Sequence, residues 1–139
     1  MQFRNLGNPK AITLVELIIV LVILGIIFVF AIPSYQKSIE RSRAKNAEFN
    51  LIAIYNAQKR YKLDTGGYYS CSAAPCDVQD IKENLGVEIS DPYFIYAISG
   101  GATIFTAEAK RLDEGGCANK VMKVTQDSSV IDKEQCPLW

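Results

Sequence analysis

The chain has 139 residues, enough for one domain and an appendage, and its 15 basic residues balance its 15 acidic ones. It has no basic stripe of the kind that binds nucleic acid, so no nucleic-acid partner is predicted. Its lack of histidine removes the commonest general base and metal ligand. We therefore predict no catalysis, no cofactor and no metal site.

The first segment combines a polar start with a long apolar run. Residues 1–10 carry Arg4 and Lys10 and no acid, and residues 12–32 carry one charge, Glu16. At about 1.5 Å per residue the apolar run spans roughly 30 Å, the thickness of a bilayer's hydrocarbon core. Because basic residues precede the run, the start is expected in the cytoplasm and the remainder outside.

Three interpretations compete for this run. A secretory signal peptide would be cut after it, and Val29-Phe30-Ala31 is similar to a small-x-small cleavage site. The run is longer than the usual apolar core of a signal, however, and it contains a carboxylate. A plain membrane anchor leaves Glu16 unexplained, since an acid at the centre of a lipid-facing helix costs about 2.5–3.5 kcal/mol. The third interpretation is a helix in which the charge of Glu16 has a function.

The start of the run resembles a known processing motif. The stretch Ala11-Ile12-Thr13-Leu14-Val15-Glu16-Leu17 looks like the cleavage and methylation motif of type IV prepilins and type II secretion pseudopilins. The resemblance extends to Gly25, Pro33 and Tyr35, and it covers about 25 residues in all.

The resemblance implies specific processing. A prepilin peptidase would cut between Ala11 and Ile12, the new amine of Ile12 would be methylated, and Glu16 would become the fifth mature residue. One departure is that the family usually has glycine where this chain has Ala11. The implied partners are copies of the chain, that peptidase, the membrane, an inner-membrane assembly platform and minor pilins.

Glu16 also has a physical role of its own in this interpretation. After cleavage, the ammonium of Ile12 would lie one helical turn from Glu16, in its own copy or in a neighbour. Pairing the two charges removes the penalty of a bare charge in lipid and sets the axial register between helices. The alternative is that Glu16 lies near the interface and reaches water. Together with Thr13, the motif favours the assembly role.

A helix is expected to continue after Pro33, which should kink it. Its charged start is interpreted as a solvated turn, and Phe49 and Ile52 either face neighbouring helices or widen the buried face. The helix should end before Gly66-Gly67. A helix over residues 12–63 measures roughly 75 Å, which suits side-by-side packing along a fibre. The solvated charges are Lys37, Glu40, Arg41, Arg43 and Lys45, and the buried stripe is Ala44, Ala47, Leu51, Ile54 and Tyr55, extended by Gln58 and Tyr61.

The four cysteines all follow the apolar run, on the oxidising side of the membrane, so they predict disulfides. Three pairings are possible, and proximity in sequence favours Cys71–Cys76 and Cys117–Cys136. Residues 64–92 form a turn-rich connection, in which one helical turn is expected over Ile81–Leu85 with Asp80 near its cap.

Antiparallel strands are expected in the remainder. Tyr93–Ile98 and Ala102–Ala109 form a hairpin around Ser99-Gly100-Gly101. A third strand covers Lys120–Thr125 after a turn at Gly115-Gly116 and Asn119, and a short one includes Val130-Ile131. The fold class is therefore α+β, a long helix on a small sheet of three or four strands, which resembles the pilin fold. In pilins a late cysteine pair closes a C-terminal loop, a role that Cys117 and Cys136 fit.

Calcium binding is the one metal alternative considered, because some pseudopilins carry such a site in their last loop. Asp113 and Glu114, or Asp127 and Asp132, are candidate ligands, but no D-x-D-x-D-G pattern is present. Scattered surface carboxylates are the preferred interpretation.

The predicted organisation is a leader over 1–11, a membrane-spanning and filament-core helix over 12–33, an amphipathic helix over 34–63 and a head over 64–139. The predicted function is that of a pilin precursor, held in the inner membrane and then assembled into a surface filament. One alternative is a type II secretion pseudopilin, which would be periplasmic. Two others are a single-span membrane-anchored binding domain and a soluble exported protein.

Overall fold

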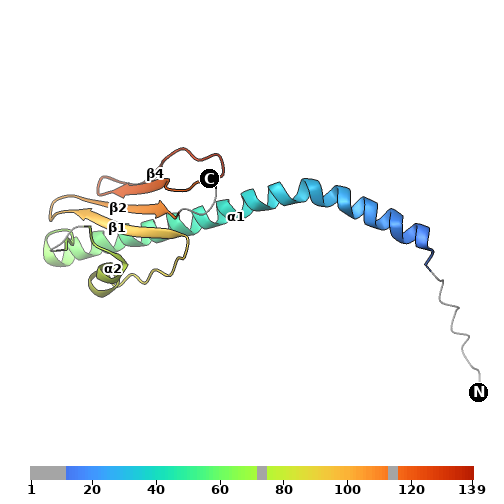
Figure 1. Cartoon of the computed structure of the whole chain (residues 1–139). Coiled ribbons are helices and arrows are strands. Elements are labelled where there is room, and N and C mark those ends of the chain that lie inside the picture. Colours follow the sequence, from blue (N-terminus) through green and yellow to red (C-terminus); the bar gives the residue numbers. More distant parts are fainter. Residues whose placement is uncertain (1–11, 72–74, 113–115) are drawn as a thin grey trace, which may run out of the picture. The chain divides into compact units, whose positions relative to one another are not determined.

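The computed structural model describes residues 12–71, 75–112 and 116–139. The chain divides into two compact units, one ending at Gln36 and the other running from Lys37 to Trp139. One long helix, α1 (Leu14–Thr65), passes through both, and the second unit adds a short helix and four strands (Figure 1). The predicted α+β class, with a long helix on a small antiparallel sheet, is confirmed.

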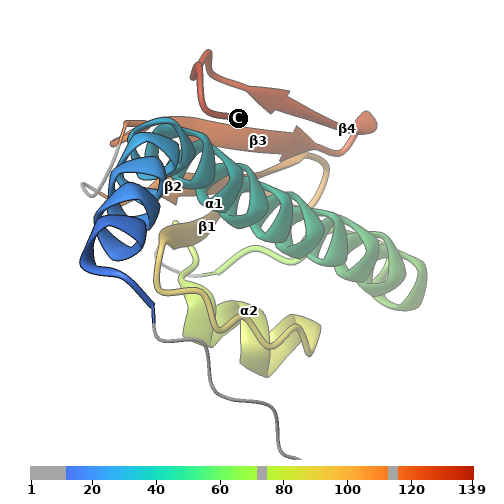
Figure 2. The same ribbon diagram turned by 90° about the vertical axis from the view of Figure 1, so that its right-hand side faces the viewer.

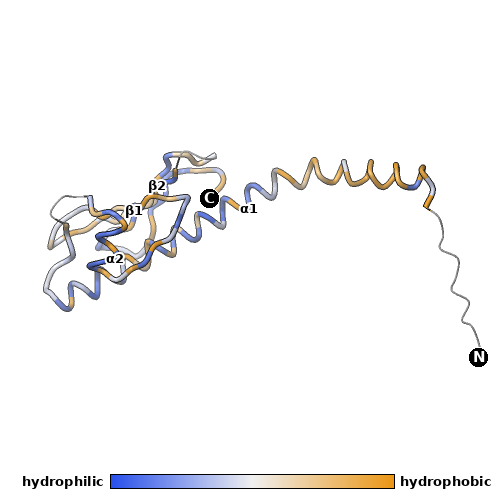
Figure 3. Tube along the Cα trace, turned by 60° about the horizontal axis from the view of Figure 1, so that its bottom comes forward, coloured by the Kyte–Doolittle hydropathy of each residue, from blue (hydrophilic) through white to orange (hydrophobic). Residues whose placement is uncertain are grey.

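The first unit consists of the apolar half of α1. Its hydropathy is nearly uniform around the helix, whereas the second half of α1 alternates between apolar and polar residues (Figure 3). Among the described residues, α1 is the helix that has the length and composition to cross a membrane. α1 continues through position 33, but the side chain of Pro33 lies outside the described part, so the expected kink stays a prediction.

In the second unit, α1 buries one stripe against the sheet. Ala44, Ala47, Leu51 and Ile54 are at most 3% exposed, and they recur every three or four residues as an amphipathic helix requires. The expected stripe is confirmed. α1 ends at Thr65, where Gly66 takes a left-handed conformation (φ 88°) and donates its N–H to the Lys62 carbonyl at 2.9 Å.

The short helix α2 (Val78–Leu85) begins three residues before the expected turn. Its N-cap is Asp77, and Asp80 lies near this cap as expected: the Asp77 carboxylate accepts the N–H groups of Gln79 (2.9 Å) and Asp80 (3.0 Å). The Asp80 carboxylate in turn accepts the backbone N–H of Asp77 at 3.2 Å, which completes a capping box. Ile81 and Leu85 are the buried residues that anchor α2.

The sheet is a four-stranded antiparallel meander in the order β1-β2-β3-β4. Burial alternates along its first three strands, so one face packs on the second half of α1, as Figures 1 and 2 show, and the other stays polar. The strands are β1 (Phe94–Gly100), β2 (Phe105–Arg111), β3 (Val121–Thr125) and β4 (Ser128–Lys133).

The hairpin between β1 and β2 is confirmed but shifted. Gly100 belongs to β1 and pairs with Phe105. Residues 102–104, which were expected to begin the second strand, therefore lie in the turn. Gly100 has φ 126°, and a Cβ there would collide with the Ile104 carbonyl oxygen. The start of the second strand is shifted because glycine alone fits this close approach of the two strands.

Side chains also join α1 to the sheet. The Tyr96 hydroxyl accepts from Asn50 Nδ2 on α1 at 3.0 Å and donates to the Asp91 carboxylate at 2.6 Å. Burial, and then the bond to Asp91, raise the pKa of Tyr96 well above its usual value. Tyr55 on α1 lies with its ring centroid 6.1 Å from that of Phe105. The head therefore has a complete core of its own.

Candidate assembly site

The start of α1 brings together two residues that the sequence singled out. The Thr13 hydroxyl oxygen accepts the backbone N–H of Glu16 at 3.2 Å, and the Thr13 carbonyl accepts the N–H of Leu17 at 3.2 Å. Thr13 is thus the N-cap of α1, and Glu16 occupies its third helical position. Sequence reasoning missed this cap, although T-x-x-E before an apolar run is its known signature.

The same geometry places a carboxylate at the positive end of the helix dipole. Glu16 lies in the first turn of α1, where a negative charge is favoured by about 0.3–1 kcal/mol. Ile12, the expected first mature residue, precedes the cap and is 75% exposed. Ala11, and with it the expected cleavage bond, lies outside the described residues.

The apolar run presents its side chains outward on every side. Each large apolar residue from Leu14 to Ile32 is at least 43% exposed, whereas soluble monomers rarely expose contiguous apolar patches beyond a few hundred Å². A Cβ at Gly25 would meet no atom within 4 Å, so packing inside this chain does not explain that glycine. This surface requires lipid or other helices to cover it.

The charged start of the second unit contains a buried ion pair. Arg111, at the end of β2, donates Nε to Glu40 Oε1 at 2.7 Å and Nη2 to Glu40 Oε2 at 3.1 Å. Its Nη1 donates to the Tyr93 carbonyl at 2.9 Å, so each of the three guanidinium nitrogens donates a hydrogen bond. The residues are 4% (Glu40) and 0% (Arg111) exposed, so the pair ties α1 to the sheet from within the core.

The interpretation of residues 37–45 as a solvated turn was therefore wrong for Glu40 and Arg43. Arg43 is half-buried, 3.4 Å from Glu40, with its guanidinium 3.9 Å above the ring of Tyr93. Burial by itself would raise the pKa of Glu40, but the hydrogen bonds and charge of Arg111, helped by Arg43, hold that pKa below its ordinary value. No local sequence pattern marks a partner 71 residues away.

Both cysteine pairs are joined in the structure. Cys71 is bonded to Cys76 and Cys117 to Cys136, with Cα atoms 5.6 Å and 5.7 Å apart. The second disulfide holds the C-terminal tail on the head, where the side chain of Leu138 covers Gly116 and the ring of Trp139 lies 6.2 Å from that of Phe94. Trp139 at the end of the tail is thus partly buried against the core.

The calcium alternative falls partly outside the structure. Asp113 and Glu114 lie outside the described residues, and among the residues that are described no group of three or more cysteine or carboxylate side chains is placed to hold a metal ion. The absence of a metal site therefore stays a prediction.

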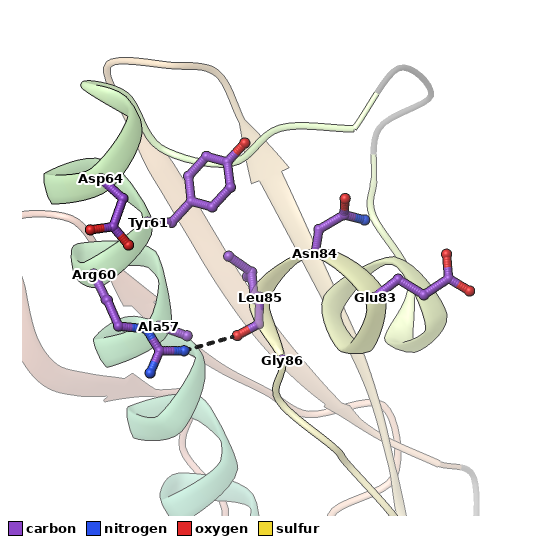
Figure 4. Close-up of a pocket in the computed structure, with 8 residues that line it drawn as sticks. All are labelled: Ala57, Arg60, Tyr61, Asp64, Glu83, Asn84, Leu85 and Gly86. Atoms are coloured by element: carbon purple, nitrogen blue, oxygen red, sulfur yellow. Dashed lines mark hydrogen bonds between the residues drawn. The ribbon is translucent and has the colours of Figure 1, made fainter.

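A shallow hollow lies between the end of α1 and α2. It has a volume of about 350 Å³, and Arg60, Asp64 and Glu83 are among the residues that line it (Figure 4). Arg60 Nη2 donates to the Leu85 carbonyl at 3.4 Å across one side of it. The described residues that line this hollow include no histidine and no cysteine.

Comparison with known proteins identifies the N-terminal segment. Residues 7–32 match the family model described as the prokaryotic N-terminal methylation motif. No solved structure matches the chain.

Two kinds of curated protein are similar to the chain. It is 45% identical over 63 residues (44% of this chain) to the type IV major pilin protein PilA of Myxococcus xanthus. It is 38% identical over 65 residues (47% of this chain) to the type II secretion system core protein G of Vibrio cholerae, and 30% identical over 65 residues to that of Escherichia coli. The matched segments span 29%, 44% and 45% of these relatives, respectively.

Proposed function

We propose that the chain belongs to the type IV pilin and type II secretion pseudopilin family and is a pilin precursor, because residues 7–32 match the N-terminal methylation motif and its matched segments are similar to a pilin and to secretion core proteins. After its leader is removed, copies would polymerise through α1 into a type IV pilus. The members of this family are structural subunits and not enzymes, and we propose that this chain likewise catalyses no reaction and is a substrate of the prepilin peptidase.

The observation that carries the proposal is the exposed apolar half of α1 with one carboxylate at its start. A helix with apolar side chains on all sides is stable in lipid or inside a bundle of similar helices. A fibre supplies such a bundle, and a membrane holds the subunit before assembly.

We further propose that Glu16 pairs with the amine of Ile12. Cleavage after Ala11 would create an ammonium immediately before the Thr13 cap, at the end of the helix where the dipole disfavours positive charge. The Glu16 carboxylate on the first turn neutralises this ammonium and offsets its unfavourable interaction with the helix dipole. In a filament the pair can also form between copies, and a helix that slides out of register leaves both charges bare in an apolar surrounding.

The proposed locations follow from this assembly. The precursor would span the inner membrane once, with residues 1–11 in the cytoplasm, before extraction into a surface filament. The proposed partners are other copies of the chain, the prepilin peptidase, the assembly platform in the inner membrane and minor pilins.

A pseudopilin of a type II secretion system is the second candidate. It is favoured by the similarity to two secretion core proteins, of which the matched segments cover a larger share than of the pilin. The disulfide-closed tail favours the pilin. Filaments on the cell surface that contain the chain support the pilin, whereas periplasmic assembly and a head that folds only with calcium would support the pseudopilin.

Intact-mass measurement on sheared surface filaments tests the proposal most directly. The expected mass is that of a chain starting at Ile12 with one added methyl group and two disulfides. A chain that retains Met1 would favour the membrane-anchored binding domain, and one that starts at Ile32 would establish the soluble exported protein. Either result contradicts the filament proposal.

Two substitutions at Glu16 separate its charge from its place in the cap. Glutamine at this position can serve a capping box but carries no charge. We expect Glu16→Gln and Glu16→Ala to lower filament yield equally, by about 100-fold if the unpaired amine costs 2.5–3.5 kcal/mol. Membrane insertion and leader cleavage should be retained, and Glu108→Ala in the head serves as the control. Normal yield from Glu16→Gln would leave capping as the sole role of Glu16.

A further inference from the structure

The segment of α1 that follows the apolar run has basic side chains on one side of the helix. Lys37, Arg41 and Lys45 recur at spacings of four, and all three are exposed. The sequence from residue 17 to residue 47 contains one acid, Glu40. The charge that this surface presents therefore depends on where the Glu40 side chain is directed.

The fold removes the charge of Glu40 from this surface. Glu40 follows Lys37 by three residues, a spacing at which the two side chains could pair along the helix. It is instead 4% exposed, and both of its carboxylate oxygens accept hydrogen bonds from Arg111. Among the described residues neither Lys37 nor Arg41 forms an ion pair. These two exposed side chains therefore keep an unbalanced positive charge.

Both charges follow closely on the proposed membrane span. The apolar run ends at Ile32, and along α1 Lys37 comes about 7.5 Å and Arg41 about 14 Å after it. The polar layer of a bilayer adds about 5–7 Å on each side of the hydrocarbon core. Lysine and arginine carry their charges on long stems that can bend toward that layer. Tyr35, which is 68% exposed, has the side chain that membrane interfaces favour.

We infer that Lys37 and Arg41 bind the phosphate groups of anionic phospholipids on the exported side of the membrane. The inference rests on the membrane-spanning state in the proposed function and does not depend on polymerisation. Phosphate oxygens accept charge-assisted hydrogen bonds from lysine and arginine. Bonds of this kind would anchor α1 at the interface and set its depth in the bilayer before extraction into a filament.

Lys45 provides a comparison within the same helix. It lies about 20 Å beyond Ile32, past the polar layer, and it is bonded to Glu48 at 2.9 Å. Its side chain is 74% exposed, so a soluble anion such as a nucleic acid could approach it as readily as Lys37 or Arg41. Phosphates at a membrane surface could not. The order of effects along α1 therefore distinguishes a lipid from a soluble partner.

The lipid selectivity of the full-length chain tests the inference. The chain is purified in detergent with equal amounts of phosphatidylglycerol and phosphatidylcholine, and native mass spectrometry gives the ratio of the two lipid adducts. Lys37→Gln and Arg41→Gln should each lower the preference for phosphatidylglycerol about fivefold, and the double variant about 25-fold. Lys45→Gln is the matched control and should leave the ratio unchanged. Added salt should weaken the preference in the unmodified chain.

Three results would overturn the inference. The first is equal binding of the two lipids by the unmodified chain. The second is an equal loss of preference in Lys45→Gln and Arg41→Gln, which would reveal a general attraction of anions to α1. The third is displacement of phosphatidylglycerol by an excess of soluble glycerol phosphate, which would assign the two residues to a free phosphate compound. Circular dichroism of each variant should match that of the unmodified chain, since all three side chains are exposed.

Flotation of the full-length chain with vesicles of the same two lipids reports separately on the proposed function. A chain that floats with the vesicles but shows no preference for phosphatidylglycerol would overturn the lipid contact and leave the membrane-spanning subunit standing. A chain that does not float would contradict the membrane-spanning state, and the lipid contact would fail with it. The expected result is flotation of the unmodified chain and of all variants, with the lipid preference lost in the Lys37 and Arg41 variants.

Discussion

The two halves of α1 belong to one helix but have opposite relations to the rest of the chain. From Leu14 to Ile32 every large apolar side chain is at least 43% exposed, whereas Ala47, Leu51 and Ile54 are fully buried. The second half packs against the head of the same chain through a hydrophobic core and a buried ion pair. Among the described residues none buries the apolar side chains of the first half, so this surface has its use in a membrane or among other copies.

This comparison predicts that stability resides in the head and assembly in the apolar half. The largest expected effect on stability comes from the ion pair. Arg111→Met would leave the buried Glu40 carboxylate without its partner and should lower the free energy of unfolding by about 3–5 kcal/mol. Urea unfolding followed by circular dichroism measures it.

The double variant Glu40→Met with Arg111→Met provides the control for that experiment. Replacing both charges with apolar side chains removes the unpaired carboxylate, so this variant should recover most of the stability that the single variant loses. If both variants are equally unstable, the loss comes from packing of the arginine side chain and not from the unpaired, buried charge of Glu40.

Removal of the late disulfide should have the next largest effect. Cys117→Ser with Cys136→Ser opens a loop with a sequence separation of 19 and should cost about 3 kcal/mol. The Cys71–Cys76 bond, with a separation of 5, should contribute about 2 kcal/mol because it constrains a shorter loop. Thermal unfolding of both double variants tests this order, and fluorescence of the single tryptophan, Trp139, reports whether the tail has detached.

Acid should weaken the head through Glu40. Its pKa is lower in the folded head than its ordinary value of about 4.5, so the folded state binds fewer protons on this carboxyl. The resulting stability is present above about pH 4.5 and is lost as the pH falls toward the folded pKa. Unfolding measured between pH 7 and pH 3 should show this fall, and it should be smaller in Glu40→Gln, which keeps no titrating group there.

The smallest expected effect is that of removing the first unit. A fragment of residues 37–139 should unfold with the free energy of the head in the whole chain, within about 0.5 kcal/mol, since core contacts of the head lie inside it. Leu51→Ala in that fragment should cost 2–5 kcal/mol and shows that the measurement responds to core packing. A fragment that does not fold would contradict the division of roles between the two halves.

The sequence by itself determined the features that local patterns encode. The apolar run, the T-x-x-E start with its processing motif, the stripe through Leu51 and Ile54 and the alternating strands each have a signature within a few residues. Tertiary structure alone decided which residues meet across the chain. The sequence pattern predicted a solvated charge at Glu40, but the fold places this side chain against Arg111, 71 residues away. The sequence left open whether Phe49 widens the buried face of α1 or faces neighbouring helices, and in the structure the sheet covers the other side of α1 and leaves Phe49 exposed. Such pairings depend on how distant segments pack, and local periodicity in the sequence does not predict that packing.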